Sequence, residues 1–292
     1  MAKKRVNRTK ARKGRAGIRV SWRVGMSLLV VAVLYVGLRY VALDPDRVAA
    51  ATDGVARRMG LVTGLERTVT APSLDEVEVR YGAMTVSFNP ELHIPNWVGW
   101  ELTREKASGT EPRADRFMRD DNVRGCASPE DYRGSGYDRG HMAPAADMKW
   151  DVKAMRKSFL LTNVCPQDHA LNAGSWKKLE EKCRMWAMAD SVIYIVAGPV
   201  LTDTIDEYIG ESGVAVPKRF FKVIASPYAD PPRGIGFIMP NGRVPGGMQA
   251  SAMSIDDVEA ITGHDFFSEL PDDVEAVVES QCRFNLWSTL RP

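Results

Sequence analysis

The segment around His141 combines residue types that the hydrolysis of a phosphodiester can use. His141 directly follows Asp138, Arg139 and Gly140 in the sequence. A neutral imidazole accepts a proton from water near pH 7, and a guanidinium group carries a fixed positive charge for phosphate oxygens. Glycine allows a tight backbone approach. We therefore predict that His141 is a general base and that Arg139 binds phosphate, whereas Asp138 is a structural acid that orients this loop.

A second group of polar residues lies further along the chain, at Asn172 and Glu180. Apolar residues recur at helical spacing from Trp176 to Trp186, which predicts a helix that begins near Asn172. On a regular helix Asn172 and Glu180 share a broad face but lie about 12 Å apart along the axis. They cannot both bind one ion directly without a bend. One of them can instead bind a divalent cation such as Mg²⁺, which keeps several waters, while the other holds a coordinated water.

Three segments carry a resemblance to a known family. Asp138–Ala145 reads DRGHMAPA, Thr162–Gln167 reads TNVCPQ, and Leu171–Glu180 reads LNAGSWKKLE. In this order they resemble the DNA/RNA non-specific endonucleases that have a ββα-metal active site, most closely the endonuclease G branch. The resemblance extends over roughly residues 75–265.

The resemblance implies a fold class and a role for each matching residue. The expected class is α+β, a ββα-metal nuclease fold with a central, mainly antiparallel sheet flanked by helices. His141 matches the general base, and Arg139 matches the phosphate-stabilising arginine. Asn172 matches the single protein ligand of a hydrated Mg²⁺ or Mn²⁺, and Glu180 matches the acid that holds metal-bound water. The implied activity is sugar-non-specific hydrolysis of DNA and RNA, and a homodimer is suggested by analogy alone.

Two further sets of residues match the family less closely. Asn163 and Gln167 match supporting polar positions around the site and are expected to contact the substrate. The family also uses an arginine upstream of the histidine motif. Arg113, Arg116 and Arg119 all lie in the corresponding region, and the sequence does not choose among them.

Structural roles are expected for several other polar residues. Glu181 is the alternative to Glu180, because a shift of one residue exchanges them, and the spacing favours Glu180. Asp147 is expected to be a surface acid, and Lys177 with Lys178 either contacts the nucleic-acid backbone or lies on a solvated helix face. The other histidines are expected to be surface or core residues: His93, His169 and His264.

The charge of the chain is divided between a basic tail and an acidic body. The 292 residues carry a net charge of +2, to which residues 1–23 contribute +10 and the remaining residues −8. A body with this charge is not a general nucleic-acid binder, so any affinity for phosphate must be local. It also leaves open a phosphodiesterase for another substrate, because long-range steering of a polyanion would be weak.

The remaining motifs exclude several classes of site. The four cysteines form no CxxC pair and show no zinc-binding spacing. One or two disulfides would be compatible with an oxidising compartment. The sequence contains neither a GxGxxG motif after a strand nor a GxxxxGK motif, so dinucleotide and P-loop sites have no support.

The N-terminal part is expected to be a targeting or membrane-anchoring segment and not part of the folded domain. Residues 24–43 are mostly aliphatic and predict a transmembrane anchor. The basic tail 1–23 before it predicts a cytoplasmic N-terminus and an extracytoplasmic body. A cleaved signal peptide, with a site at Ala49–Ala51, and a mitochondrial presequence before an inner-membrane anchor are the alternatives. A short helix and linker over 44–73 then lead to a nuclease domain over 74–292.

The elements that must position the site mix strands and helices without a regular rhythm, which favours the α+β class. Residues 106–137 are polar and are expected to form a long excursion. Strands are expected over 76–88, 97–102, 159–164, 191–200, 214–226 and 235–239, and helices over 151–158, from Asn172, from Ser254 and from Pro271.

The alternative function on the same fold is a non-catalytic, membrane-anchored protein that binds or takes up nucleic acid. The complete set of His141, Asn172 and Glu180 argues against it, because binding alone needs no general base. A chelator discriminates between the two functions, because only hydrolysis requires the metal.

Overall fold

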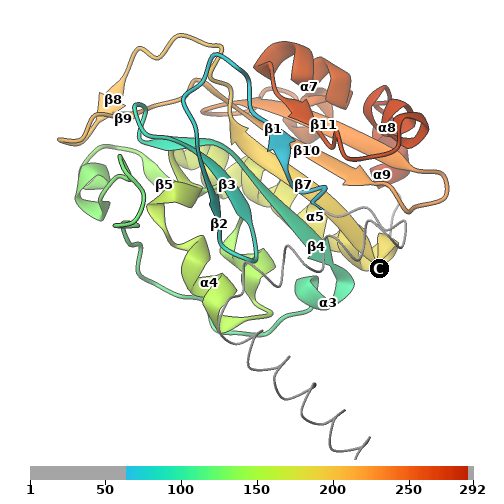
Figure 1. Ribbon diagram of the computed structural model, residues 1–292, viewed down its shortest axis with the longest axis horizontal. Coiled ribbons are helices and arrows are strands. Elements are labelled where there is room, and N and C mark those ends of the chain that lie inside the picture. Colours follow the sequence, from blue (N-terminus) through green and yellow to red (C-terminus); the bar gives the residue numbers. More distant parts are fainter. Residues whose placement is uncertain (1–63, 289–292) are drawn as a thin grey trace, which may run out of the picture. The chain divides into compact units, whose positions relative to one another are not determined.

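The computed structural model describes residues 64–288, which build a central antiparallel sheet of seven strands (Figure 1). Every strand in this sheet pairs antiparallel with its neighbours. The mixed fold with a central antiparallel sheet is therefore confirmed. In spatial order the strands are β12 (Ala252–Met253), β11 (Arg233–Pro240), β10 (Arg219–Ser226), β7 (Val192–Pro199), β4 (Ile94–Thr103), β3 (Thr85–Asn89) and β2 (Val77–Arg80).

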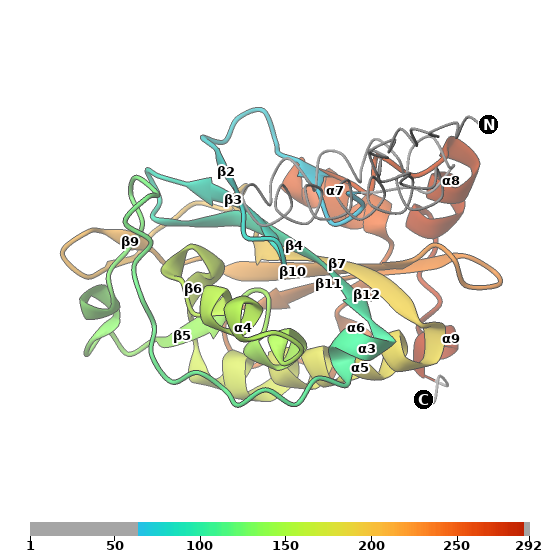
Figure 2. The same cartoon turned by 60° about the horizontal axis from the view of Figure 1, so that its bottom comes forward.

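Helices cover both faces of the sheet (Figure 2). The helices are α3 (Arg104–Ala107), α4 (Val152–Ser158), α5 (Lys177–Asp190), α6 (Gly247–Ala250), α7 (Ile255–Thr262), α8 (Asp272–Glu279) and α9 (Phe284–Ser288). In Figure 2, α4 and α5 lie below the sheet, and α7 and α8 lie above it.

Side chains that alternate along the central strands form a separate core on each face. Trp100 and Phe220 pack with Leu179 of α5 in the first core. Trp97 and Phe221, on the same two strands, belong to the second core, beneath α7 and α8. Because successive side chains of a strand point to opposite faces, these apolar strands are buried on both sides.

Three two-stranded pairs and several short turns complete the described chain. The pairs are β1 (Thr68–Val69) with β13 (Asp265–Phe266), β5 (Asp138–His141) with β6 (Val164–Gln167), and β8 (Tyr208–Ile209) with β9 (Val214–Ala215). The turns are the 3₁₀ segments Pro129–Tyr132, Ala145–Met148 and Leu161–Asn163, and the π-helical segment Leu171–Trp176.

Three element boundaries differ from the expectation in ways that matter for the site. The apolar run 159–164 was expected to be a strand, but it ends in a 3₁₀ turn and the strand β6 begins only at Val164. The run 214–226 is interrupted by Pro217, which has no N–H to donate to a ladder, and forms two strands. The helix expected from Asn172 is regular only from Lys177, after the π-helical segment.

The folded part begins before residue 74, the expected start of the domain. Leu65 is buried in the core beneath α7 and α8, and β1 pairs with β13, so part of the expected linker belongs to the fold. The tail, the anchor over 24–43 and the expected helix after it lie outside the described residues. Within residues 64–288, no helix has the length and apolar character that crossing a bilayer requires. The four cysteines are all free thiols.

Candidate active site

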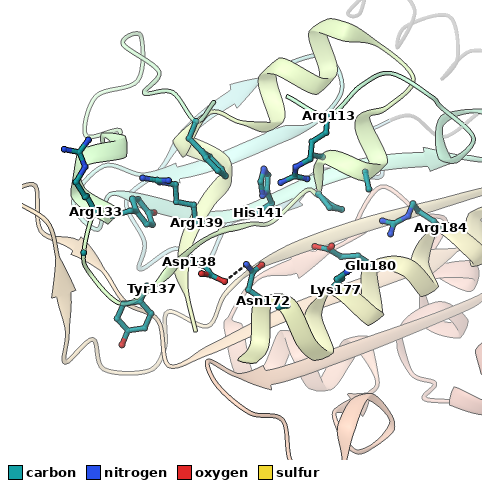
Figure 3. Close-up of a pocket in the computed structure, with 17 residues that line it drawn as sticks. Arg113, Arg133, Tyr137, Asp138, Arg139, His141, Asn172, Lys177, Glu180 and Arg184 are labelled. Atoms are coloured by element: carbon teal, nitrogen blue, oxygen red, sulfur yellow. Dashed lines mark hydrogen bonds between the residues drawn. The ribbon is translucent and has the colours of Figure 1, made fainter. Parts of the chain in front are cut away.

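A cavity of about 650 Å³ lies beside the β5–β6 pair and the start of α5 (Figure 3). It contains His141, Asn172 and Glu180, three side chains that the sequence places in separate segments. Its other charged or phenolic lining residues are Arg113, Tyr132, Arg133, Tyr137, Asp138, Arg139, Lys177 and Arg184.

The position of His141 follows from the pairing of two short strands. His141 ends β5 and stands opposite Val164 of β6. The indole N–H of Trp176 donates to the His141 carbonyl oxygen over 3.3 Å, which ties this strand end to the start of α5. The imidazole packs against the rings of Phe117 and Phe159, with centroid distances of 5.0 and 4.9 Å.

The surroundings of His141 keep its imidazole neutral. The residue is only 9% exposed, and its Nε2 is buried with no hydrogen-bond partner among the described residues. Burial, together with the positive charge of Arg113, lowers the pKa of His141 to about 3. A neutral ring with a nitrogen free of hydrogen bonds can accept a proton. An anionic phosphate bound in the cavity would raise this pKa towards neutrality, because it stabilises the imidazolium.

A kink in the backbone brings Asn172 to the cavity wall. Gly174 departs from helical dihedral angles, with φ −102° and ψ −111°, inside the π-helical segment. Asn172 and Glu180 therefore do not lie on one regular helix, and the bend that direct sharing of an ion would require is present between them. Both side chains line the same cavity.

Asp138 sets the orientation of the Asn172 amide. The Asn172 Nδ2 donates to the Asp138 Oδ2 over 2.9 Å, and the amide oxygen lies on the side of Glu180 (Figure 3). The same carboxylate oxygen lies 2.8 Å from the Nδ1 of the exposed His169. Such outer hydrogen bonds orient a metal ligand. Asn172 and Glu180 thus offer an amide oxygen and a carboxylate, the hard donors that suit a hydrated Mg²⁺ or Mn²⁺.

Burial and a neighbouring ammonium group have opposite effects on the pKa of Glu180. Burial raises the pKa of Glu180 to about 7, while the ammonium group of Lys222 opposes this rise. Lys222 is fully buried, lies over the rings of Trp100 and Trp176, and places its Nζ 3.3 Å from the Met142 carbonyl oxygen. A cation at the cavity would favour the ionised form of Glu180.

Asp147 is not a surface acid as expected. It is 1% exposed, and its two carboxylate oxygens accept from Arg184 Nη1 over 2.9 Å and from Trp100 Nε1 over 3.0 Å. The sequence around Asp147 does not reveal this burial, because both partners come from distant elements. Asp147 therefore holds Arg184 at the cavity and does not line the cavity itself.

The cavity wall carries more positive than negative side chains. Arg139 lies against the rings of Phe117 and Tyr132 and donates to the Pro129 carbonyl oxygen over 2.9 Å. Of the three upstream arginines, only Arg113 lines the cavity. This local excess of positive charge suits an anionic ligand, although the body as a whole carries a net negative charge.

Sequence reasoning missed two cationic residues of the wall, Arg133 and Arg184, and left Arg113 and Lys177 undecided. Arg184 was not singled out, and Lys177 was assigned either to nucleic acid or to a solvated helix face. Lys177 and Arg184 lie three residues before and four residues after Glu180 on α5. Residues at this spacing share one helix face, so the signal was present in the sequence.

Asn163 and Gln167 lie behind the site, and neither lines the cavity. This placement fits the expected supporting positions, and their contact with substrate stays a prediction. Asn163 is fully buried and makes three hydrogen bonds of 2.8–2.9 Å to the main chain of Ala143 and Ser158. Gln167 is also fully buried and packs on Gly140, where an added Cβ would lie 2.1 Å from the Gln167 Oε1.

The Asn163→Ala substitution should destabilise the fold more than it affects substrate binding. It leaves the N–H and C=O of Ala143 and the C=O of Ser158 without partners, and we expect the free energy of unfolding to fall by about 2–5 kcal/mol. Urea denaturation followed by circular dichroism measures this change. Asn172→Ala is the matched control, with an expected loss of about 1 kcal/mol or less, because Asn172 makes one side-chain hydrogen bond at a half-buried position. Unchanged stability of Asn163→Ala with a raised KM would instead make Asn163 a substrate contact.

His264 and His93 each make a hydrogen bond to the main chain away from the cavity. The Nδ1 of His264 accepts from the Ala71 N–H over 3.0 Å inside the second core. The Nδ1 of His93 lies 2.7 Å from the Gly125 carbonyl oxygen. Neither residue lines the cavity.

Comparisons with known proteins identify the family to which the chain belongs. The sequence profile of the DNA/RNA non-specific endonucleases matches residues 63–273. The mitochondrial nuclease EXOG of Mus musculus is 34% identical over 209 residues, covering 65% of this chain and 57% of that protein. The mitochondrial endonuclease G of Homo sapiens is 34% identical over 165 residues, covering 52% of this chain and 55% of that protein. The chain thus spans just over half the length of these relatives.

A solved structure also resembles the fold. A chain of the EndoG/EndoGI complex, which was described for the mechanism of EndoG inhibition, superposes with a TM-score of 0.65 and 26% identity. The superposition covers 71% of this chain and 92% of that one.

Proposed function

The chain belongs to the DNA/RNA non-specific endonuclease family, and from this premise we propose that it is a metal-dependent endonuclease that hydrolyses phosphodiester bonds of DNA and RNA. One observation carries the proposal. A buried, neutral His141, whose Nε2 has no hydrogen-bond partner within residues 64–288, shares a cavity with the oxygen donors of Asn172 and Glu180.

Asn172 and Glu180 would hold the metal ion. Asn172 is the proposed direct ligand, because Asp138 fixes its amide, and Glu180 is proposed to hold one of the waters around the ion. A hydrated Mg²⁺ or Mn²⁺ at this position supplies positive charge for the phosphate and for the departing oxygen.

His141 is proposed to remove a proton from the attacking water. Its ring is fixed between Phe117 and Phe159, so the proton-accepting nitrogen keeps one position in the cavity. Fixed geometry favours a general base, because little reorganisation is needed when the water attacks in line with the leaving 3′ oxygen. The imidazolium formed in this step would be stabilised by the substrate phosphate.

The arginines of the wall are proposed to bind the phosphate and to stabilise its growing negative charge. Arg113 lies beside His141, Arg184 is held by Asp147, and Arg139 lines the cavity beyond the imidazole (Figure 3). Contacts to phosphate do not depend on base or sugar. We therefore propose cleavage of DNA and RNA with little sequence preference.

The proposed function is tested with supercoiled plasmid DNA and with a structured RNA. The full chain should nick and then degrade both substrates in Mg²⁺, EDTA should abolish cleavage, and excess Mg²⁺ or Mn²⁺ should restore it. Gel electrophoresis reads each outcome. Binding of both nucleic acids without cleavage at any metal concentration would favour the non-catalytic binding protein. Cleavage of small phosphodiesters alone would favour another substrate.

We make separate proposals for the cellular compartment and for the oligomeric state. We propose that residues 24–43 tether the nuclease to a membrane, with the basic tail on the cytoplasmic side. The names of the relatives contain the word mitochondrial, which favours the mitochondrial alternative. A homodimer is proposed from the endonuclease G resemblance alone.

A further inference from the structure

Three carboxylates converge where α7 meets the end of α8. These two helices lie on the face of the sheet opposite α5, the helix that contributes to the cavity (Figure 2). Asp256 and Glu259 lie three residues apart on α7 and therefore share one helix face. Glu279 is the last residue of α8. One carboxylate oxygen from each of the three residues lies within 4.8 Å of the others. We call these residues the α7–α8 triad.

Glu279 is the unusual member of the triad. Its side chain is 7% exposed, and its Oε1 is buried without a hydrogen-bond partner in the described part of the chain. A carboxylate at the C-terminal end of a helix also faces the negative end of the helix dipole. A buried carboxylate in this position is costly unless a positive group or a hydrogen-bond donor compensates it.

The surroundings of the triad add negative charge. Asp265 and Glu275 also interact unfavourably with Glu259 and Glu279. Between residues 64 and 288, no lysine or arginine forms an ion pair with any residue of the triad. Burial, reinforced by the neighbouring carboxylates, raises the pKa of Glu279 to about 9, and burial is also the main cause that raises the pKa of Glu259 to about 7.

The carboxylate of Glu259 has a structural partner and still has an oxygen to offer. Its Oε1 accepts from the Phe266 N–H over 2.7 Å, which ties the side chain to β13. The arrangement is thus rigid on the α7 side. Asp256 is exposed, so solvent and ions can reach the triad from its side.

We propose that Asp256, Glu259 and Glu279 bind a hard divalent cation, Ca²⁺, at a site separate from the catalytic cavity. Ca²⁺ binds oxygen ligands at about 2.3–2.6 Å, so two ligands of one ion lie at most about 5 Å apart. The oxygens of the triad already satisfy this limit. The ion neutralises the cluster and ties α7 to the end of α8 against β11, and waters complete its coordination.

The test of this proposal uses the full chain. The catalytic cavity is the same in every variant, because all substitutions lie outside it. Glu279→Gln keeps the shape of the side chain and removes its charge. Asp273→Asn removes one charge from the same helix, outside the triad, and is the matched control. Equilibrium dialysis against Ca²⁺ with elemental analysis counts bound ions, and Tm is measured in EDTA and in increasing CaCl₂.

We expect the wild-type chain and Asp273→Asn to bind one more Ca²⁺ per chain than Glu279→Gln. At a hundredfold excess over Kd, Ca²⁺ should raise their Tm by about 5–10 °C more than that of Glu279→Gln. In EDTA, Glu279→Gln should be at least as stable as wild type, because glutamine is neutral without the proton uptake that burial imposes on Glu279, and this result also shows that the variant folds. Glu259→Gln is a second variant, since glutamine retains an oxygen for the Phe266 N–H.

Equal Ca²⁺ stoichiometry in the wild-type chain and Glu279→Gln would overturn the proposal, as would a wild-type Tm that does not respond to Ca²⁺. Protonation of Glu279, whose pKa is raised to about 9, would then be what compensates its burial. Adding 5 mM Mg²⁺ to every dialysis tests the preference for Ca²⁺. Loss of the extra bound Ca²⁺ under this condition would contradict the calcium assignment. None of these measurements depends on nuclease activity, so their outcome is independent of the proposed function.

Discussion

The His141→Ala variant should retain its fold and lose roughly 10²–10⁴-fold in kcat/KM for plasmid nicking in saturating Mg²⁺. Among the described residues, His141 is the only histidine that lines the cavity, and its Nε2 has no partner there that would compete for a proton. Without it, the attacking water must lose its proton to solvent. Initial rates of nicking, with the variant at the same Tm as wild type to within a few degrees, measure the effect.

Two further measurements separate a lost base from a damaged site. The half-saturating Mg²⁺ concentration of His141→Ala should match that of wild type, because Asn172 and Glu180 are intact. His169→Ala is the matched control: His169 is exposed and lies outside the cavity lining, although it contacts Asp138. We expect less than about a tenfold loss for the control. Wild-type rates in His141→Ala would contradict the proposed role of this residue.

The second large effect concerns Glu180 and the pH dependence of metal binding. The pKa of Glu180 is about 7 in the metal-free protein, because burial disfavours its charge. Below pH 7 this carboxyl group takes up a proton and loses the negative charge with which it would hold a water of the ion. The half-saturating Mg²⁺ concentration should therefore rise about tenfold for each pH unit below 7 and level off above pH 8. The pKa of His141 is about 3, so this residue does not titrate in the metal-free protein between pH 5.5 and 8.5.

Glu180→Gln should raise the half-saturating Mg²⁺ concentration by about 10–100-fold and remove its pH dependence. Glu181→Gln is a matched control, because Glu181 is the next residue on α5, is exposed and does not line the cavity. It should behave as wild type. Activity titrated with Mg²⁺ at pH 6, 7 and 8 measures both variants. A larger loss in Glu181→Gln than in Glu180→Gln would exchange the two assignments.

The sequence predicted the family and the segments that meet at the cavity. The family is confirmed, and so is the mixed fold with a central antiparallel sheet. His141, Asn172 and Glu180 were identifiable because each lies in a short motif whose order along the chain is itself informative. The helix α5 is a local element, so its hydrophobic spacing indicated where it lies, whereas the strand β5 was not among the strands expected from the sequence. The roles of the three residues stay predictions until the variants are measured.

The tertiary structure alone decided which polar residues face the cavity and which lie behind it. The sequence could not single out Arg113 among the three upstream arginines. The polar segment that carries it has no regular hydrophobic pattern, and its position is fixed by long-range contacts such as that of Phe117 with Phe159. Asp147 and Asn163 look like solvent-exposed or substrate-binding residues in sequence, yet long-range packing buries both. The α7–α8 triad likewise needs two helices brought together. Local patterns encode which face of an element is apolar, whereas the partner of a buried polar group depends on how distant segments pack.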